Sequence, residues 1–287
     1  MKKIIFPSEY FNIKDTLECG QVFRFKPYKK GFLVFSTDKC AYCYGENGQT
    51  VIECEEKDES YFYNYFDLNR DYSSIYSDAI EKGINILISS ATRGKGIRIL
   101  NQDPVETLFS FIISQNNNIP RIKGIIEKLC TFLGEKKLFN GIEYFSFPTA
   151  KAMSENTVDF FKGLSLGYRA DYIYKLSVDI SSGFDILKFS NLSTIELKKN
   201  LLKIHGVGPK VADCVMLFGF HRSDSFPVDT WIDKVYRENF NGTLTNREKI
   251  SEWFLLEFKE NAGYFQQYLF HYKRIKEKIE HEEQKGE

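Results

Sequence analysis

The sequence predicts an α+β protein in which an antiparallel β-sheet is followed by a mostly α-helical region. Two observations lead to this fold class. Up to about residue 75, short apolar runs alternate with polar residues and are separated by turn signals such as Glu46-Asn47-Gly48. From Tyr72 onward, apolar residues recur at the spacing of amphipathic helices. We therefore expect a sheet domain with flanking helices over residues 1–98 and an all-helical region over residues 99–287.

Individual elements follow from local signals. Strands are expected within four alternating runs, which cover residues 23–25, 31–35, 41–44 and 50–54. In the second region, Asp103-Pro104 should begin a helix through Ser114, and Pro120 should begin another that ends at Gly134. Residues 273–287 are charged and nearly free of apolar side chains, so we expect a helical tail that frays.

The composition is that of a globular protein, with 43% hydrophobic and 16% aromatic residues among 287. Lysine plus arginine and aspartate plus glutamate both number 39, so the net charge is zero. Binding to a polyanion then requires segregated charges, and we expect the acidic run 53–59 to lie away from it. Six cysteines stand at positions 19, 40, 43, 54, 130 and 214. Only Cys40 and Cys43 have metal-like spacing, and they lie in an alternating run, so we expect reduced thiols and no metal.

The most informative segment is a pair of helices joined by a glycine turn. Ser193 and Glu196 form a capping box ahead of a helix expected over residues 194–204. Gly206 ends that helix, and Pro209 suits the first position of the next one. These features predict a helix-hairpin-helix over about residues 194–220.

The turn itself has two interpretations. Gly206 and Gly208 would allow positive φ and expose backbone N–H groups at a helix N-terminus, where phosphate binds. A Gly-x-Gly sequence by itself also fits an ordinary turn between helices. The surrounding basic group favours a surface that faces phosphate, and it consists of Lys198, Lys199, Lys203, His205 and Lys210.

Lys210 and Asp229 are the candidate catalytic residues. A cation in the first turn of a helix opposes the helix dipole, which hints at function for Lys210, although many helix lysines are merely solvated. The helix N-terminus and partial burial would favour the neutral, nucleophilic amine. Asp229 should cap the helix that follows it, and a carboxylate held there can also stabilise positive charge on a sugar. Cys214 lies one turn after Lys210 and fits either a site residue or a small buried hydrophobe.

These segments resemble the helix-hairpin-helix glycosylase superfamily with its Gly/Pro-rich loop and aspartate (HhH-GPD), and specifically the 8-oxoguanine DNA glycosylase/lyases. The most specific part is the string from Gly206 to Cys214 followed by Pro227-Val228-Asp229. Four more segments agree with it: Gly20-Gln21-Val22-Phe23-Arg24, Asn116-Asn117-Asn118-Ile119-Pro120-Arg121, Gly167-Tyr168-Arg169 and Phe265-Gln266-Gln267-Tyr268-Leu269-Phe270. Each of the four also fits a purely structural role, and their joint occurrence in order favours the resemblance.

The resemblance implies a role for each residue. Lys210 would be the nucleophile and Asp229 its electrostatic partner. The Gly20 carbonyl would accept the hydrogen that 8-oxoguanine, unlike guanine, carries on N7. The rest of the base pocket would be formed by Cys214, Gln266 and Phe270. The implied DNA-binding residues are Asn116 and Tyr168 in the gap left by the extruded nucleotide, Arg121 and Arg169 on the orphaned cytosine, and His205, Gly206 and Gly208 at the hairpin. Trp231 departs from the pattern, because the best-known eukaryotic members carry a phosphate-contacting histidine there.

The implied function is that of a bifunctional DNA glycosylase/AP lyase. Such an enzyme excises 8-oxoguanine, preferably opposite cytosine, from duplex DNA by base flipping, Schiff-base formation at lysine and β-elimination. Two alternatives stay open: a glycosylase of the same superfamily for another damaged base, and a noncatalytic helix-hairpin-helix DNA-binding protein.

The expected partner is double-stranded DNA containing 8-oxoguanine, bound by a monomer without a membrane. We expect no metal or organic cofactor, apart from a monovalent cation that the resemblance allows at the hairpin carbonyls. No cysteine follows Cys214, so an iron–sulfur cluster is not expected. The sequence shows neither a signal peptide nor a long apolar segment, which predicts an intracellular protein, cytoplasmic and nucleoid-associated if prokaryotic.

Overall fold

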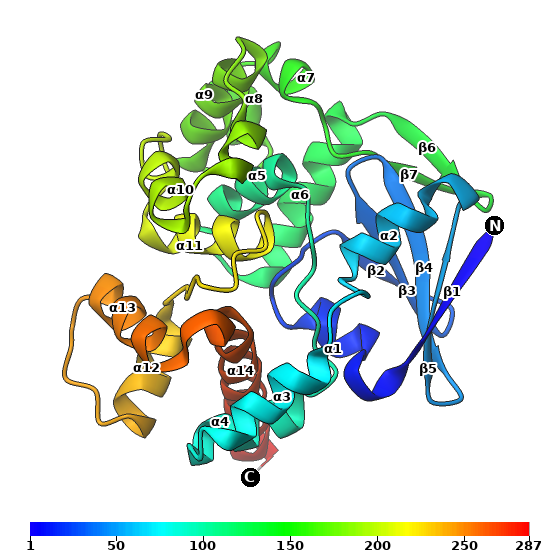
Figure 1. Ribbon diagram of the computed structural model, residues 1–287. Coiled ribbons are helices and arrows are strands. Elements are labelled where there is room, and N and C mark those ends of the chain that lie inside the picture. Colours follow the sequence, from blue (N-terminus) through cyan, green and yellow to red (C-terminus); the bar gives the residue numbers. More distant parts are fainter. Residues whose placement is uncertain (287) are drawn as a thin grey trace.

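The computed structural model describes residues 1–286 and confirms the α+β fold class, with a sheet first and helices after it (Figure 1). The strands are β1 (Lys2–Pro7), β2 (Phe25–Tyr28), β3 (Gly31–Ser36), β4 (Lys39–Glu46), β5 (Gln49–Cys54), β6 (Lys136–Phe139) and β7 (Ile142–Phe145). The helices are α1 (Ile13–Glu18), α2 (Glu59–Tyr65), α3 (Tyr72–Glu81), α4 (Asn85–Gly94), α5 (Pro104–Ser114), α6 (Ile119–Leu133), α7 (Ala150–Ser154), α8 (Val158–Gly163), α9 (Arg169–Ser181), α10 (Thr194–Leu201), α11 (Pro209–Phe218), α12 (Thr230–Asn239), α13 (Arg247–Phe258) and α14 (Ala262–Gly286).

The first five strands form one antiparallel sheet in the order β1-β5-β4-β3-β2. Both faces of this sheet are covered, because alternate residues of β4 enter two separate apolar clusters. Cys43 packs with residues of α1 and α2, whereas Cys40 packs on the opposite face with Phe139 of β6. The two thiols therefore point away from each other, as the alternating strand predicted.

The sequence missed two features of the β-structure. β1 carries a single buried residue, Ile4, and so lacks a clear alternation. The region 99–287 is also not all-helical, because β6 and β7 form a two-stranded hairpin that packs against the sheet. Its turn is Asn140-Gly141, and both residues have positive φ, at 48° and 78°. Asn-Gly is a strong hairpin signal, so the sequence did contain the evidence for this turn.

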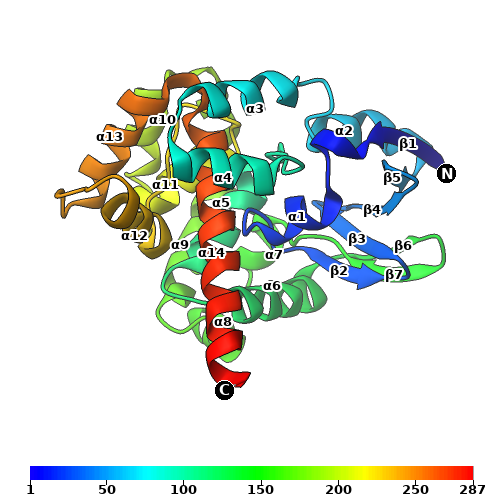
Figure 2. The ribbon, with the colours of Figure 1, turned by 90° about the horizontal axis from the view of Figure 1, so that it is seen from below.

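α5 lies at the centre of the helical region. Eight of its residues are buried, and it packs against α6, α9 and α11. Asp103 caps it and Pro104 occupies its first turn, as predicted. Helices α3 and α4 precede α5 in the chain, yet α4 packs against the C-terminal helix α14 (Figure 2). Thus the C-terminal helices are held against the first hundred residues of the chain.

α14 continues the helix to Gly286, and Glu287 lies outside the described residues, so the fraying of the tail stays a prediction. Among the described residues, no helix is both long and apolar enough to cross a lipid bilayer.

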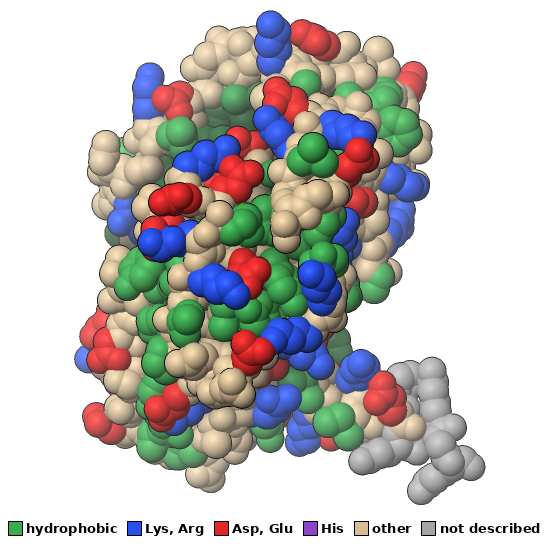
Figure 3. Space-filling view, turned by 90° about the vertical axis from the view of Figure 1, so that its right-hand side faces the viewer, with side chains coloured by type: hydrophobic (Ala, Val, Ile, Leu, Met, Phe, Trp, Pro, Cys, Tyr) green, Lys and Arg blue, Asp and Glu red, His purple; other side chains and the backbone are tan. Residues whose placement is uncertain are grey.

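Charged side chains are not grouped by sign on the sheet side of the molecule. In Figure 3, lysines and arginines alternate with acidic residues over the visible face. Glu53 and Glu59, at the two ends of the acidic run, form ion pairs with Lys3 and Lys2 at 2.8 and 3.4 Å. This run lies on β5 and α2, whereas the glycine hairpin lies across the molecule, between α10 and α11 (Figure 1).

Candidate active site

The helix-hairpin-helix forms as predicted at its start, where Ser193 and Glu196 make a complete capping box. α10 ends at Leu201 rather than at residue 204, because the chain tightens into turns such as the one that Ile204 N closes on Leu201 O at 3.1 Å. Gly206 then takes a φ of +85°, and a Cβ atom on it would lie 2.4 Å from Cγ of Tyr172. Only glycine fits this position, both for its backbone and for its contact with α9.

Gly208 does not adopt the predicted positive φ. It caps α11 with an extended backbone, at φ −94° and ψ 177°. A Cβ atom on Gly208 would meet no described atom within 4 Å, so the residue leaves open space in front of the first turn of α11. The absence of a side chain therefore matters for access to the backbone N–H groups and not for backbone conformation.

Asp229 caps α12, as predicted. Its Oδ1 accepts hydrogen bonds from the backbone N–H groups of Trp231 and Ile232 at 2.9 and 3.0 Å. These two bonds fix the carboxylate and use one of its oxygens. No hydrogen bond to Oδ2 is found among the described residues, so the second oxygen is free for another partner.

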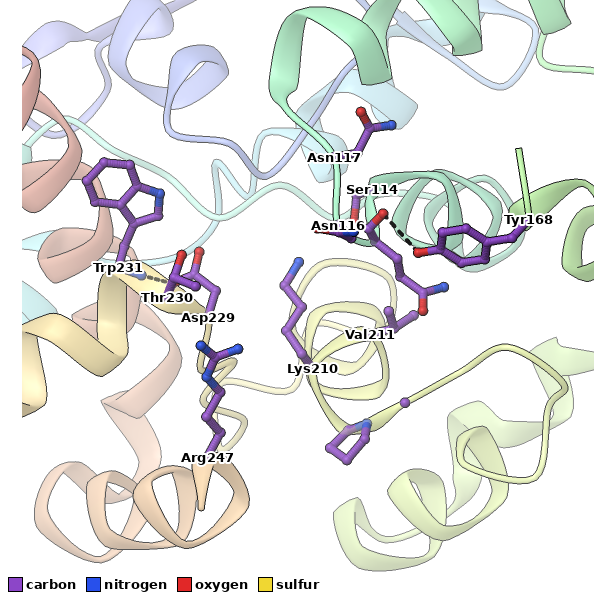
Figure 4. A pocket seen from close by; sticks show the side chains of 13 residues that line it. Ser114, Asn116, Asn117, Tyr168, Lys210, Val211, Asp229, Thr230, Trp231 and Arg247 are labelled. Atoms are coloured by element: carbon purple, nitrogen blue, oxygen red, sulfur yellow. Dashed lines mark hydrogen bonds between the residues drawn. The ribbon is translucent and has the colours of Figure 1, made fainter. Parts of the chain in front are cut away.

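Lys210 and Asp229 line the same cavity, which has a volume of about 570 Å³. Figure 4 shows them on facing walls, with the Lys210 side chain extended into the space between them. The lining residues come from the ends of α5, α9, α11, α12 and α13 and from the loop after α5: Ser114, Gln115, Asn116, Asn117, Tyr168, Gly208, Pro209, Lys210, Val211, Asp229, Thr230, Trp231 and Arg247. Four of these helices begin at the cavity, and helix N-termini carry partial positive charge. The cavity is thus suited to an anionic ligand.

A second, smaller cavity of about 40 Å³ adjoins the first and shares Lys210 and Asp229 with it. Its lining includes the four residues predicted for the base pocket, which are Gly20, Cys214, Gln266 and Phe270. The other lining residues are Phe111, Lys210, Phe218, Pro227, Asp229 and Gln267. A space of this size holds only a few water molecules. A nucleobase can enter only if a wall moves.

Phe270 is the wall that faces Gly20. Gly20 has a φ of +87°, and a Cβ atom on it would lie 3.0 Å from Cε1 of Phe270. The centre of the Phe270 ring also lies 5.3 Å from the guanidinium carbon of Arg274. The Nη1 atom of Arg274 donates a hydrogen bond to Glu18 O at 3.2 Å. The ring is therefore held between a glycine and a cation, and either a side chain at position 20 or an entering base would displace it.

Gln266 lines this cavity and carries a buried, unpaired acceptor. Its Nε2 donates to the carbonyl of Pro227 at 3.1 Å, and its buried Oε1 has no hydrogen-bond partner among the described residues. Because a carbonyl can only accept, this bond fixes which end of the amide is the nitrogen and which is the oxygen. A buried, unpaired acceptor costs about 1–3 kcal/mol, so a ligand that donates a hydrogen bond here gains affinity.

Cys214 is buried in the same wall. Burial raises its pKa to about 11, although nearby Lys210 partly offsets the effect. The thiol is therefore neutral at pH 7 and acts as an apolar wall. The Lys210 Nζ lies 5.1 Å from the centre of the Phe111 ring, so its amine also borders apolar surface.

The loop after α5 is held by Arg169. Arg169 is buried, and it donates to the carbonyls of Gln115 at 2.8 Å and Asn116 at 2.9 Å. Asn116 takes a φ of +45° and is exposed, while Tyr168 is 52% exposed and borders the large cavity. Asn116 and Tyr168 thus both border the large cavity, and their gap-filling role stays a prediction. Arg169 supports the loop from within, and its predicted contact with cytosine stays a prediction that requires the guanidinium to leave these carbonyls.

The remaining predicted DNA-binding residues are exposed. Arg121 lies in the first turn of α6 and donates to Ser165 O at 3.3 Å. His205 lies in the hairpin turn, with its Nε2 3.1 Å from an oxygen of Asp171. Both are available to a partner, and their roles stay predictions.

Sequence reasoning missed Arg247, Phe111 and Gln267 as residues of the two cavities. A signal existed for Arg247, because it is a cation in the first turn of α13, as Lys210 is in α11. Nothing in the local sequence distinguishes Phe111 from other apolar residues of α5.

The chain is similar to known proteins in sequence and in fold. Residues 3–108 match the family model described as the N-terminal domain of 8-oxoguanine DNA glycosylase. A probable N-glycosylase/DNA lyase of Methanothermobacter thermautotrophicus is 30% identical over 229 residues, which is 73% of this chain and 72% of the relative. The N-glycosylase/DNA lyase of Saccharomyces cerevisiae is 36% identical over 181 residues, which is 58% and 47% of the two chains. The 8-oxoguanine glycosylase/lyase of Clostridium acetobutylicum, solved with duplex DNA containing cytosine opposite 8-oxoguanine, superposes with a TM-score of 0.89 at 35% identity over 94% of this chain and 93% of that one.

Proposed function

This chain belongs to the N-glycosylase/DNA lyase family of 8-oxoguanine glycosylases, and we propose that it removes 8-oxoguanine from duplex DNA and then cleaves the strand. One observation carries the proposal. Lys210 and Asp229 border both the large cavity and the smaller cavity that adjoins it. A nucleotide extruded from a duplex would place its sugar in the first space and its base in the second.

Lys210 would act as the nucleophile in its neutral form. Its nitrogen forms a bond to C1′ while the bond from C1′ to the base breaks, and that electron pair leaves with the base, which takes up a proton. Asp229 stabilises the positive charge that gathers on the sugar in the transition state. Opening of the sugar ring gives the Schiff base, and loss of a C2′ proton then expels the 3′ phosphate by β-elimination.

Recognition of the base would use two acceptors. The Gly20 carbonyl accepts no hydrogen bond within the described part of the chain, and the same is true of Gln266 Oε1. The N7 hydrogen of 8-oxoguanine would pair with the first, and the donors on the pairing edge of the base with the second. Guanine lacks the N7 hydrogen, and one unpaired acceptor of about 1–3 kcal/mol gives roughly 10- to 100-fold discrimination.

Preference for cytosine opposite the lesion would depend first on Arg121, because this arginine is exposed beside the loop of Asn116. Arg169 would join it only after leaving the carbonyls of Gln115 and Asn116. We further propose that the protein acts on duplex DNA as a monomer and inside the cell.

The proposed reaction takes its nucleophile and its stabilising charge from side chains, so it needs no organic cofactor. A monovalent cation at the hairpin would be held by carbonyl oxygens of the turn. Ile204 O already accepts from Val207 N at 3.0 Å and Gly206 O from Gln115 Nε2 at 2.9 Å. A carbonyl oxygen has two lone pairs, so each keeps one position for an ion. Such an ion would steady the turn, and no step of the reaction passes through it.

Borohydride trapping tests the proposal. Incubation with a duplex that contains 8-oxoguanine opposite cytosine should give a covalent protein–DNA adduct, because borohydride reduces the Schiff base. Lys210→Gln should bind the same duplex and give no adduct. Lys57→Gln is the matched control, since Lys57 is an exposed lysine in the acidic run and lies outside the cavity, and it should trap normally. An adduct in the Lys210→Gln protein, or faster release of an alkylated base or oxidised pyrimidine than of 8-oxoguanine, would contradict the proposal.

A further inference from the structure

Two facing walls of the large cavity belong to different helices. One wall consists of Gly208, Pro209, Lys210 and Val211 at the start of α11, and the other of Asp229, Thr230, Trp231 and Arg247 at the starts of α12 and α13 (Figure 4). A sugar between Lys210 and Asp229 carries one phosphate on its 5′ side and one on its 3′ side. The hairpin wall offers backbone N–H groups to one of these phosphates. The other phosphate must approach the wall that carries the Asp229 carboxylate.

That second wall needs a positive charge. A phosphodiester and a carboxylate in one partly enclosed space repel each other, and the low dielectric of the site strengthens the repulsion. Among the described residues that line the cavity, Lys210 and Arg247 are the cationic ones. Lys210 must be neutral to attack C1′, so it is not available as a counter-charge. Arg247 is left as the residue that can offset Asp229.

Arg247 is placed for this role. Its side chain is 48% exposed, and its Nε lies 3.5 Å from an oxygen of Asp233. This contact orients the side chain and uses none of its terminal nitrogens, which point toward Asp229 in Figure 4. Asp233 is shared with Arg237, whose Nε lies 2.9 Å away, so it neutralises Arg247 only in part. Within the described part of the chain, its two terminal nitrogens form no ion pair or hydrogen bond, and such a guanidinium matches the geometry of a phosphate.

The position of Arg247 in its own helix is a second, independent sign. It occupies the first position of α13, where a cation opposes the helix dipole. The helix gains nothing from this choice, since Asn246 supplies the cap by accepting from Glu248 N and Lys249 N. Lys210 stands at the second position of α11, which is also in the unfavourable first turn. Both misplaced cations border the one cavity.

Trp231 completes the argument. It lines the same wall, and its ring lies 5.2 Å from the Lys234 amine, which is itself paired with Glu277 at 3.1 Å. An indole is never cationic and offers a single donor, so Trp231 is a poor counter-charge for a phosphate. We propose that Arg247 binds a phosphodiester of the lesion strand next to the extruded nucleotide and thereby shields it from Asp229. This inference rests on the proposed function and adds a phosphate-binding residue to it.

The test measures binding without chemistry. The probe is a duplex with a tetrahydrofuran abasic analogue opposite cytosine, titrated at several salt concentrations. Arg247→Ala should raise Kd about tenfold at low salt, the loss of one charge-assisted bond, and should lower the slope of log Kd against log salt by about 0.9. Arg247→Lys should restore the slope but only part of the affinity. Lys249→Ala removes an equal charge from the same helix, where Lys249 pairs with Glu252 at 2.8 Å, and should behave as wild type.

A second measurement locates the contact. Each phosphate that flanks the abasic analogue is replaced in turn by an uncharged methylphosphonate. One replacement should weaken the wild type about tenfold and leave Arg247→Ala nearly unaffected, because the partner charge is already absent. Unchanged Kd and slope in Arg247→Ala, or equal methylphosphonate penalties in both proteins, would overturn the assignment. The wild type is assayed in parallel for 8-oxoguanine release. Failure to release the base would count against the proposed function, while the binding data would still decide the role of Arg247.

Discussion

Lys198 and Asp213 form a 2.8 Å ion pair that joins the two helices of the hairpin. Lys198 lies on α10 and Asp213 on α11, one turn after Lys210. Asp213 is almost wholly buried, and burial raises its pKa to about 6 even though Lys198 favours the ionised form. The helix that carries Lys210 is therefore attached to α10 through a carboxyl group whose pKa lies above the usual range of aspartate.

This pKa predicts a pH dependence of stability. The folded-state pKa of about 6 lies above the ordinary value of 3.8, so between about pH 4 and pH 6 the folded protein holds a proton that the unfolded chain has lost. The contribution of Asp213 to the free energy of unfolding is fully present below about pH 4 and is lost as the pH rises to about 6. Its size is at most about 3 kcal/mol. Urea unfolding of Asp213→Asn across this range should lack this part of the slope. Asp159→Asn, at an exposed site, should keep it.

Asp229→Asn separates capping from catalysis. Asparagine caps helices as well as aspartate does, and its side-chain oxygen can keep the bonds from Trp231 N and Ile232 N. The free energy of unfolding should therefore change by less than about 0.5 kcal/mol. Base release should fall by about 10²- to 10³-fold, because the charge that stabilises the sugar is gone. Single-turnover excision rates and thermal unfolding measure the two effects. An unchanged excision rate in Asp229→Asn would show that Asp229 acts only as a cap.

Gly20→Ala should damage activity more than its backbone strain explains. The added Cβ would lie 3.0 Å from Phe270 Cε1, so the ring, which lines the small cavity, must shift. The matched control is Gly48→Ala in the β4–β5 turn, where φ is also positive, at 72°, and no described atom lies within 4 Å of the new Cβ. Both variants should lose about 1 kcal/mol of stability from strain. Only Gly20→Ala should lose excision of 8-oxoguanine, and equal excision by both variants would contradict the contact with Phe270.

Arg121 and Arg169 should respond differently to replacement by alanine. Arg121 is exposed, so Arg121→Ala should unfold like the wild type while its excision rates opposite cytosine and adenine become more similar. Arg169→Ala removes bonds to the loop carbonyls of Gln115 and Asn116, and should also lower the unfolding temperature. Rates on matched duplexes with each opposite base check the first expectation, and calorimetry checks the second. An unchanged unfolding temperature for Arg169→Ala would contradict its supporting role.

Much of the site was predictable because its signals are local. The capping box at Ser193, the proline at the start of α11 and the cap at Asp229 depend on residues within one helical turn, and the structure has all three. Burial of Arg169 was not predictable, because its partners are carbonyls about fifty residues away in the chain. Carbonyls are present at every residue and leave no mark on the sequence.

The same reasoning explains Gly208. The sequence shows only that Gly208 has no side chain. A glycine is needed either where the backbone is left-handed or where space must stay free, and the sequence does not distinguish these two cases. Gly206 has the first and Gly208 the second. The size of the base pocket was equally hidden, since it depends on how Phe270 packs against a glycine 250 residues earlier in the chain.

Gly206 has a consequence for the energetics of association. Its carbonyl accepts from Gln115, its Cα lies against Tyr172 of α9, and Arg169 of α9 donates to Gln115 O. The hairpin turn, the loop after α5 and the start of α9 are thereby locked to one another before any nucleic acid arrives. Their conformational entropy is lost during folding and not on contact with the double helix, so little ordering opposes capture of the target.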